Sequence, residues 1–412
     1  MIEERFRNRI LRLLATFLVV IAGQGAVFAS ARPAFAQEPT VTCAAAIVVD
    51  AETGAVLYEK NADERRPIAS LTKVMTALVA AEQVRDWDMP VVADSQSCAA
   101  GESEIYLEPG ERILVRDLLA ATLLKSANDA ASLLARAVAG RTDLFVAMMN
   151  AKARSLGLTN TSFKNPHGLY EPGHYSSARD CATIARAALS YARLRELFRT
   201  RRAVIPWPGH PEGRILVNHN KLLFRDPNVK GIKTGYVRQS GHCLISYAEY
   251  GNRKVIAVVL GAPNSEACYA DSARLLRYGA SQFTTVTVAR RGEAVGTITQ
   301  GRIFSRNVPV YAAEGLSVVV PAPLASRITT ELVVFSGNRA RATGYPAALR
   351  ARLDDRVLGV IYVDGDIEHV SRDSAKSGVA KDASREAKDR QNRQASHESF
   401  FVRLVRFFLS LL

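Results

Sequence analysis

The chain lacks the features of several large protein classes. Its five cysteines are irregularly spaced, with no Cys-x-x-Cys pair, so neither a zinc site nor a dense disulfide framework is indicated. His167, Glu171 and His174 have metal-binding side chains, but their Pro- and Gly-rich surroundings favour an ordinary loop. No block of Lys and Arg interleaves with aromatic residues, and no nucleic-acid motif occurs. Neither a nucleic-acid partner nor a metal or other cofactor is therefore expected.

Negative charge is in short supply, because the 412 residues carry a formal net charge of +14. The first 36 residues contain five arginines and two glutamates, so the remainder keeps +11. A spread-out excess of this kind suits an anionic partner such as a membrane surface or an acidic polymer. The hydrophobic content of 48% is that of a globular protein, and the length suggests two to three domains.

The N-terminus has the pattern of an export signal. Four arginines precede an apolar run at residues 13–22, and Ala34-Phe35-Ala36 offers small residues for cleavage before Gln37. The run is too short for a stable membrane span, and an uncleaved anchor is the alternative. Residues 1–36 are therefore predicted to be a signal peptide, and the protein to act outside the cytoplasm.

The region 37–283 is predicted to be one mixed α+β domain. Apolar segments at 43–50 and 55–60 indicate one β-hairpin, and segments at 244–249 and 254–260 indicate another. Helical patterns lie between the hairpins, so we expect an antiparallel sheet assembled from both ends of the region, with helices packed on it. Helices are predicted from Ser70, over 116–139, 143–156 and 180–191, and near 271–279.

The C-terminal third changes character twice. In residues 284–366, short strand-like runs are broken by Gly, Pro and Asn, which predicts a small all-β domain. Residues 367–397 are rich in charge, Ala and Ser and lack Phe, Tyr and Trp, so they are predicted to be a linker.

The last segment, 398–412, is predicted to be an amphipathic helix. Its polar residues Ser399, Arg403, Arg406 and Ser410 form one narrow stripe on an apolar helix. The fourteen residues 399–412 reach only about 21 Å, short of a hydrocarbon core of roughly 30 Å. We expect the helix to lie in the membrane interface with its arginines at the headgroups; a helix docked on its own protein is the alternative.

Ser70 and Lys73 are the strongest candidates for chemistry. Three residues apart on a helix, they lie on one face, where the lysine can take the proton of the hydroxyl. Taken alone, the spacing is weak evidence, since a serine before a helix is commonly an N-cap and a lysine in the first turn is commonly solvated.

Two downstream motifs strengthen the interpretation through their order. Ser126-Ala127-Asn128 follows in a helical region, and Lys233-Thr234-Gly235, a rarer combination, precedes the late hairpin. The other Ser-x-Asn triplets, at 305–307 and 336–338, come after Lys233. Only Ser126 falls between the candidate nucleophile and the Lys-Thr-Gly motif, so the conjunction argues against chance.

With these motifs the chain resembles the penicillin-recognising serine enzymes, and among them the low-molecular-weight penicillin-binding proteins that are D-alanyl-D-alanine carboxypeptidases. Residues 66–73, 126–131 and 165–169 carry the resemblance, and the β domain, linker and terminal helix extend it. It implies a β-lactamase/transpeptidase-like domain at the periplasmic face of the inner membrane. The implied substrate is a peptidoglycan stem peptide ending in D-Ala-D-Ala, with β-lactams as inhibitors; no oligomeric state is implied.

The resemblance also implies roles for catalytic residues. Ser70 would attack the peptide carbonyl and form an acyl-enzyme. Lys73 would be the base, provided that burial and the charge of Lys233 keep it neutral. Asn128 would hold the lysine and the substrate amide, and Ser126 would relay a proton to the leaving amine.

Substrate binding is implied for the Lys-Thr-Gly segment. Lys233 and the Thr234 hydroxyl would meet the terminal carboxylate. Gly235 would let the substrate backbone approach the strand. The backbone N–H groups of Ser70 and Tyr236 would form the oxyanion hole.

The chain departs from the family pattern at three positions. Ala127 replaces the commoner glycine, Val237 stands where a threonine is frequent, and Cys268 stands where an arginine is frequent. The last two put part of the carboxylate-binding site in doubt. His219 is a further candidate contact, whereas Asp129 is expected in a helix hydrogen-bond network.

Two other functions are compatible with the early motifs. A β-lactamase of the common class needs a Glu-x-x-Leu-Asn segment, which is absent between Asn128 and Lys233. A non-catalytic peptidoglycan-binding scaffold is opposed by the intact Ser70, Lys73 and Lys233.

Overall fold

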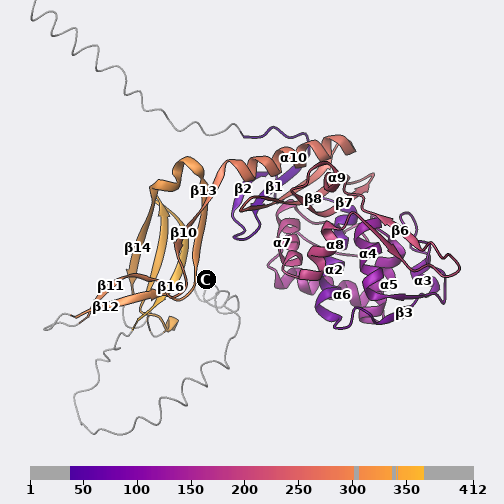
Figure 1. The fold of residues 1–412 in the computed structure, drawn as a ribbon, viewed down its shortest axis with the longest axis horizontal. Helices are drawn as coiled ribbons and strands as arrows, with labels where there is room; N and C mark the ends of the chain where they lie inside the picture. Colours follow the sequence, from indigo (N-terminus) through magenta and orange to yellow (C-terminus); the bar gives the residue numbers. More distant parts are fainter. Residues whose placement is uncertain (1–37, 301–305, 336–339, 341, 366–412) are drawn as a thin grey trace, which may run out of the picture. The chain divides into compact units, whose positions relative to one another are not determined.

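The computed structural model describes residues 38–300, 306–335, 340 and 342–365 (Figure 1). The predicted signal peptide, linker and amphipathic helix lie outside these residues. Within the described part, no helix is long and apolar enough to cross a membrane.

A five-stranded antiparallel sheet organises residues 45–281. Its order is β2-β1-β9-β8-β7, so strands from both ends of the region pair side by side, as predicted. The strands are β1 (Ala45–Asp50), β2 (Val56–Lys60), β7 (Val229–Val237), β8 (Gly241–Tyr250) and β9 (Arg253–Ala262). Both predicted hairpins are confirmed, and β7 forms an edge of the sheet.

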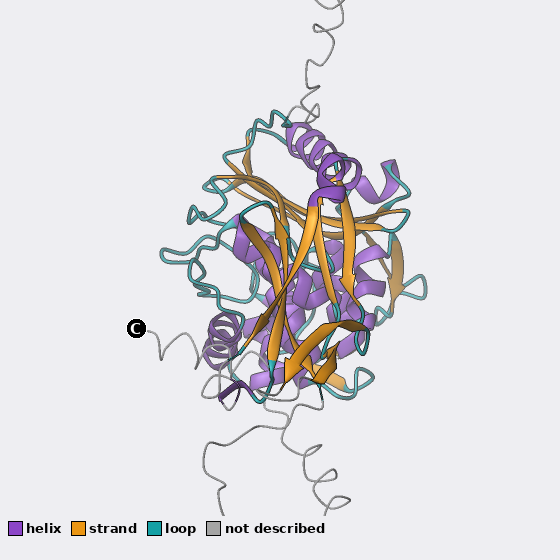
Figure 2. Ribbon diagram, turned by 90° about the vertical axis from the view of Figure 1, so that its left-hand side faces the viewer, coloured by secondary structure: helices purple, strands orange, loops and turns teal. Residues whose placement is uncertain are grey.

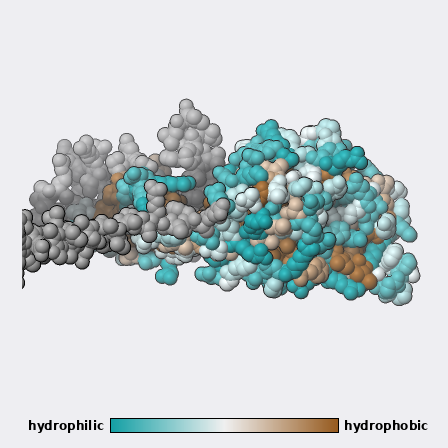
Figure 3. Space-filling view, turned by 90° about the horizontal axis from the view of Figure 1, so that it is seen from above, coloured by the Kyte–Doolittle hydropathy of each residue, from teal (hydrophilic) through white to brown (hydrophobic). Residues whose placement is uncertain are grey.

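The centre of the sheet is buried on both faces, which explains the unbroken apolar run of β1. In β1, Ala45, Ile47 and Val49 pack into the core shared with most of the helices. Ala46 and Val48 point to the other side, where they meet Leu275 and Leu276 of α10 (Ser265–Ser281). Helices thus cover both faces of the sheet (Figure 2). The exterior of this region is largely hydrophilic, with scattered apolar areas (Figure 3).

Most of the helices pack on the face of the sheet opposite α10, and they follow the predictions with two corrections. The stretch 116–139 is two α-helices separated by a π-helical turn, and the chain breaks at Ser126, whose φ of 62° is left-handed. A helix after residue 191 was not predicted. The elements are η1 (Ala69–Leu71), α2 (Thr72–Gln83), α4 (Val115–Ala120), η2 (Ala121–Lys125), α5 (Asn128–Ala139), α6 (Thr142–Ser155), α7 (Ala178–Leu189) and α8 (Ala192–Arg199).

Short elements border this helical core. Two small two-stranded sheets, β3–β4 and β5–β6, and two single-turn helices connect the longer segments. Their bounds are β3 (Pro90–Val92), α3 (Ser95–Cys98), β4 (Arg112–Leu114), β5 (Arg202–Ile205), β6 (Arg214–Val217) and α9 (Leu222–Arg225).

The described residues between 283 and 364 are mainly β, with one 3₁₀ segment and a few helical residues at 340 and 342–343. A five-stranded sheet has the order β11-β12-β16-β15-β14, and β10 pairs with β13. The elements are β10 (Phe283–Ala289), β11 (Ala294–Gln300), β12 (Arg306–Ala312), β13 (Leu316–Pro321), η3 (Ala322–Arg327), β14 (Ile328–Val334), β15 (Ala347–Leu353) and β16 (Arg356–Asp364). The α+β fold class with a β-rich C-terminal part is confirmed.

Candidate active site

Ser70 lies in the tight turn η1 immediately before α2. It is not an N-cap: no side-chain cap bond is made at the start of either helix. The preceding residue, Ala69, has a φ of 49°, a conformation that costs an L-residue energy and that turns the chain sharply. The turn therefore presents a half-buried serine at the end of a buried helix.

Two glycines make room for this turn. A Cβ at Gly168 would lie 2.0 Å from the Ala69 carbonyl oxygen, and the φ of Gly168 is +91°. A Cβ at Gly235 would lie 3.0 Å from the backbone nitrogen of Ser70. Gly235 was predicted to admit the substrate, but its missing side chain also lets β7 pack against the serine turn.

Lys73 is fully buried and directed at Ser70. Its Nζ lies 2.9 Å from Ser70 Oγ, within hydrogen-bond distance, and it donates to Asn128 Oδ1 at 2.6 Å and to the His167 carbonyl oxygen at 2.7 Å. The side chain is 0% exposed, which excludes the solvated-lysine alternative. The sequence did not reveal the His167 contact, since a backbone carbonyl leaves no residue-type signal.

Burial also determines the charge of the site. The pKa of Lys73 lies well below its usual value because the amine is desolvated and because Lys233 is near. Desolvation lowers the pKa of Lys233 to about 7 and that of His219 to about 4. His219 is therefore neutral at pH 7, and Lys233 is close to half-protonated before substrate binds; for Lys73 the lowered pKa favours the neutral amine.

Asn128 reaches the site because the helix breaks at Ser126. Its Nδ2 donates to the Gly101 carbonyl at 2.7 Å, and its backbone N–H donates to the Ser103 carbonyl at 2.6 Å. Asp129 accepts hydrogen bonds from backbone N–H groups of the same loop, those of Ile105 and Leu107, as expected of a structural residue. The Ser-x-Asn segment thus fastens the loop 101–107 beside the serine.

The edge strand β7 supplies the other wall. Lys233 is buried and donates to the Thr234 carbonyl at 2.9 Å. Tyr236 pairs with His242 across the ladder, and their rings are 4.5 Å apart. Thr234, Gly235 and Tyr236 all face the cavity.

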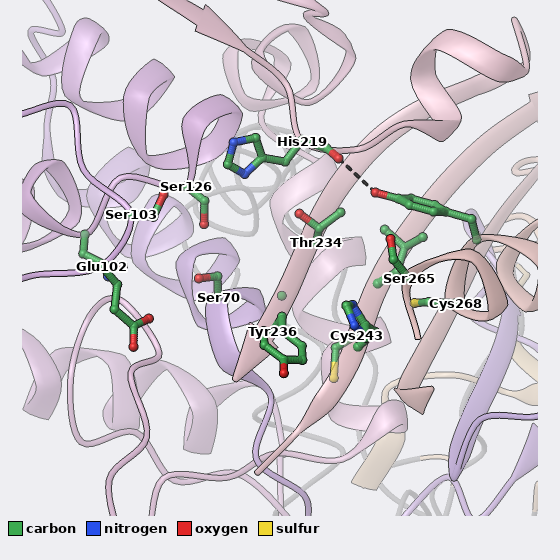
Figure 4. Close-up of a pocket in the computed structure, with 15 residues that line it drawn as sticks. Ser70, Glu102, Ser103, Ser126, His219, Thr234, Tyr236, Cys243, Ser265 and Cys268 are labelled. Carbon is green, nitrogen blue, oxygen red and sulfur yellow. Dashed lines mark hydrogen bonds between the residues drawn. The ribbon is translucent and has the colours of Figure 1, made fainter. Parts of the chain in front are cut away.

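These residues surround a pocket of about 280 Å³ (Figure 4). Six of the eight candidate site residues line it, and the remaining two, Lys73 and Lys233, are buried. The six are Ser70, Ser126, Asn128, Thr234, Gly235 and Tyr236.

Of the further residues considered in the sequence, some line the pocket and others do not. His219 lines the pocket, and its carbonyl accepts a hydrogen bond from Tyr269 at 2.9 Å. Cys268 also lines the pocket, whereas Val237 does not. Glu102 lines it as well, although the sequence gave no reason to single it out.

The loop that contains His167, Glu171 and His174 makes contacts of a structural kind. His174 Nε2 is 2.8 Å from Thr72 Oγ1, and its Nδ1 accepts the N–H of Lys164 at 3.2 Å. Across the described part of the chain, no three His, Cys, Asp or Glu side chains are grouped to hold a metal ion.

A serine on a tight turn, a buried amine in contact with it and a second buried lysine beside an edge strand define a serine acyl-transfer hydrolase of the penicillin-recognising fold. The model of the peptidase S11 family, D-alanyl-D-alanine carboxypeptidase, matches residues 32–264. The chain belongs to this family of serine-type D-alanyl-D-alanine carboxypeptidases, which are penicillin-binding proteins.

Curated relatives agree with this assignment, and a solved structure has the same fold. The D-alanyl-D-alanine carboxypeptidase DacF of Bacillus subtilis is 34% identical over 315 residues, 75% of this chain and 81% of its own. DacC of Escherichia coli is 36% identical over 323 residues, 73% of this chain and 78% of its own. The fold is also that of penicillin-binding protein 5 from Haemophilus influenzae, with a TM-score of 0.70 and 24% identity over 80% of this chain and 98% of that one.

Proposed function

We propose that Ser70 is the nucleophile and Lys73 its general base. The observation that carries this assignment is the set of partners around the buried amine. The carbonyls of Asn128 and His167 accept two N–H bonds, so a neutral Lys73 keeps its lone pair for the proton of Ser70 Oγ. As that proton moves to Nζ, Oγ bonds to the carbonyl carbon of the peptide.

We propose that the rest of the pocket handles the oxyanion and the leaving group. The N–H groups of Ser70 and Tyr236 stabilise the tetrahedral oxyanion. When the peptide C–N bond breaks, the amine of the last D-alanine takes a proton from Lys73, relayed through Ser126. Water then hydrolyses the acyl-enzyme on Ser70, and the stem peptide leaves one residue shorter.

The proposed substrate is a peptidoglycan stem peptide ending in D-Ala-D-Ala, with its free carboxylate bound by Lys233 and Thr234. The test is release of D-alanine from a synthetic pentapeptide, followed with D-amino-acid oxidase. Absence of release would leave a binding scaffold. Rapid, multiple-turnover hydrolysis of a chromogenic cephalosporin would instead indicate a β-lactamase.

The pKa of Lys233 predicts an alkaline limit to activity. The ammonium form, present below pH 7, attracts the substrate carboxylate, and the neutral form above pH 7 does not. We expect kcat/KM to fall as pH rises through about 7, in opposition to the gain from deprotonating Lys73. In Lys233→Arg the guanidinium stays charged, so this limb should move beyond pH ~9. An alkaline limb that is unchanged in Lys233→Arg would assign it to another group.

We propose that the mature protein comprises the peptidase domain 37–283, the β-rich domain 284–366, the linker 367–397 and the anchor helix 398–412, on the periplasmic face of the inner membrane. Support comes from the signal-like N-terminus and from the polar stripe Ser399, Arg403, Arg406 and Ser410. Deleting residues 399–412 should move the protein from the membrane pellet to the supernatant. A truncated protein that still pellets would place the anchor elsewhere.

A further inference from the structure

Glu102 lies on the side of the pocket opposite the proposed carboxylate site. Figure 4 shows Ser70 between Glu102 on one side and Thr234 on the other. With the scissile carbonyl at Ser70 and the terminal carboxylate at Thr234, the leaving D-alanine occupies the Thr234 side. The acyl part of the peptide, which remains on the serine, must therefore extend toward Glu102 and Tyr236.

The position of Glu102 is set by its neighbours in the chain. The carbonyl of Gly101 accepts a hydrogen bond from Asn128 Nδ2 at 2.7 Å, and the carbonyl of Ser103 accepts one from the Asn128 backbone N–H at 2.6 Å. Ser103 Oγ donates to the Lys125 carbonyl at 3.0 Å. Glu102, held between these two anchors, has a φ of 61°. Its side chain is exposed and lines the pocket, and no described residue forms a hydrogen bond or ion pair with it.

The charge of Glu102 does not help Lys73 to act as the general base. A carboxylate near Lys73 raises the lysine pKa, which opposes the lowering caused by burial and Lys233. By contrast, Glu104, two residues on, caps the Gly101 N–H at 2.7 Å and has a local structural role. The Glu102 carboxylate has neither a catalytic nor a structural partner in the described part of the protein.

The aromatic ring of Tyr236 also lines the pocket, on the side where the acyl part of the peptide would lie. Tyr236 is 57% exposed, and its ring is tilted by 32° against that of His242. Burial lowers the pKa of His242, so the imidazole is neutral at pH 7 and brings no opposing charge. A carboxylate and an aromatic face both attract cations.

We propose that Glu102 and Tyr236 bind an ammonium group on the acyl side of the substrate, so that the enzyme favours stem peptides with a free side-chain amine before D-Ala-D-Ala. The carboxylate supplies an ion pair and the ring a cation–π contact, whereas an acylated amine offers neither. This specificity rests on the proposed function, since it requires the peptide to run from Thr234 past Ser70.

The experiment compares two peptides, acetyl-Lys-D-Ala-D-Ala with a free ε-amine and the same peptide with that amine acetylated. Wild-type enzyme should release D-alanine from the free amine with a kcat/KM about three- to tenfold higher. Glu102→Gln should remove most of this preference. Glu108→Gln, an exposed carboxylate on the same segment that does not line the pocket, should keep it.

Two further measurements test the charge itself. The preference should shrink when NaCl rises from about 0.05 M to about 0.5 M, because the ion pair is exposed. Glu102→Lys should prefer a peptide whose amine carries a succinyl group, which ends in a carboxylate. Equal rates on both peptides in the wild type, or a preference that survives Glu102→Gln, would overturn the proposal. No release from either peptide would instead refute the proposed function.

Discussion

Replacing Ser70 with alanine is expected to abolish covalent labelling by a fluorescent penicillin and to reduce D-alanine release by at least ~10⁴-fold. The fold should survive, because Ser70 is half-buried and its Oγ has one hydrogen-bond partner among the described residues, Lys73. No other hydroxyl is paired with a buried amine in the described structure. The loss of activity should therefore come from the missing nucleophile and not from unfolding.

The control for this variant is Ser190→Ala, an exposed serine at the end of α7. It should label at the wild-type rate. The two variants should also unfold within a few degrees of the wild type, since neither creates a core cavity. Persistent labelling of Ser70→Ala would place the acylated residue elsewhere and would refute the assignment of the nucleophile.

Sequence patterns predicted those elements whose burial is two-sided or strongly periodic. The hairpins β1–β2 and β8–β9 each contain a long apolar run, in β1 and in β9, with turn residues between the paired strands, and such patterns leave little ambiguity. The break at Ser126 was not predictable in the same way, because Leu and Ala continue across η2 into α5. There, the need to place Asn128 beside Lys73 overrides helix propensity.

In the candidate site, too, some features could be predicted from the sequence and others could not. Side chains in ordered motifs, such as Ser70, Lys73 and Lys233, could be named because the chemistry demands those residue types. Contacts made by backbone atoms could not: the His167 carbonyl and the space left at Gly168 depend on where a distant loop folds. Predicting them requires the tertiary structure, which local patterns do not encode.

We expect the buried amine of Lys73 to be difficult to replace. Burial of a lysine costs free energy unless the group is neutral or well paired, and here three oxygen atoms lie within 2.9 Å of its Nζ. A structural amine could be charged, whereas a base must be neutral. The two roles therefore differ in their dependence on pH.

Lys73→Met and Lys73→Arg separate these roles, since methionine removes the proton acceptor and arginine keeps a permanent charge. Both should slow acylation of Ser70 by penicillin roughly 10³-fold or more, because neither can accept its proton near pH 7. In the wild type, acylation should rise with pH until Lys73 is deprotonated, at a pH well below its usual pKa. The methionine variant should lose that plateau and follow hydroxide concentration. Lys254→Met, at an exposed site, should behave as wild type; acylation of Lys73→Met within tenfold of the wild type would show that another group takes the proton.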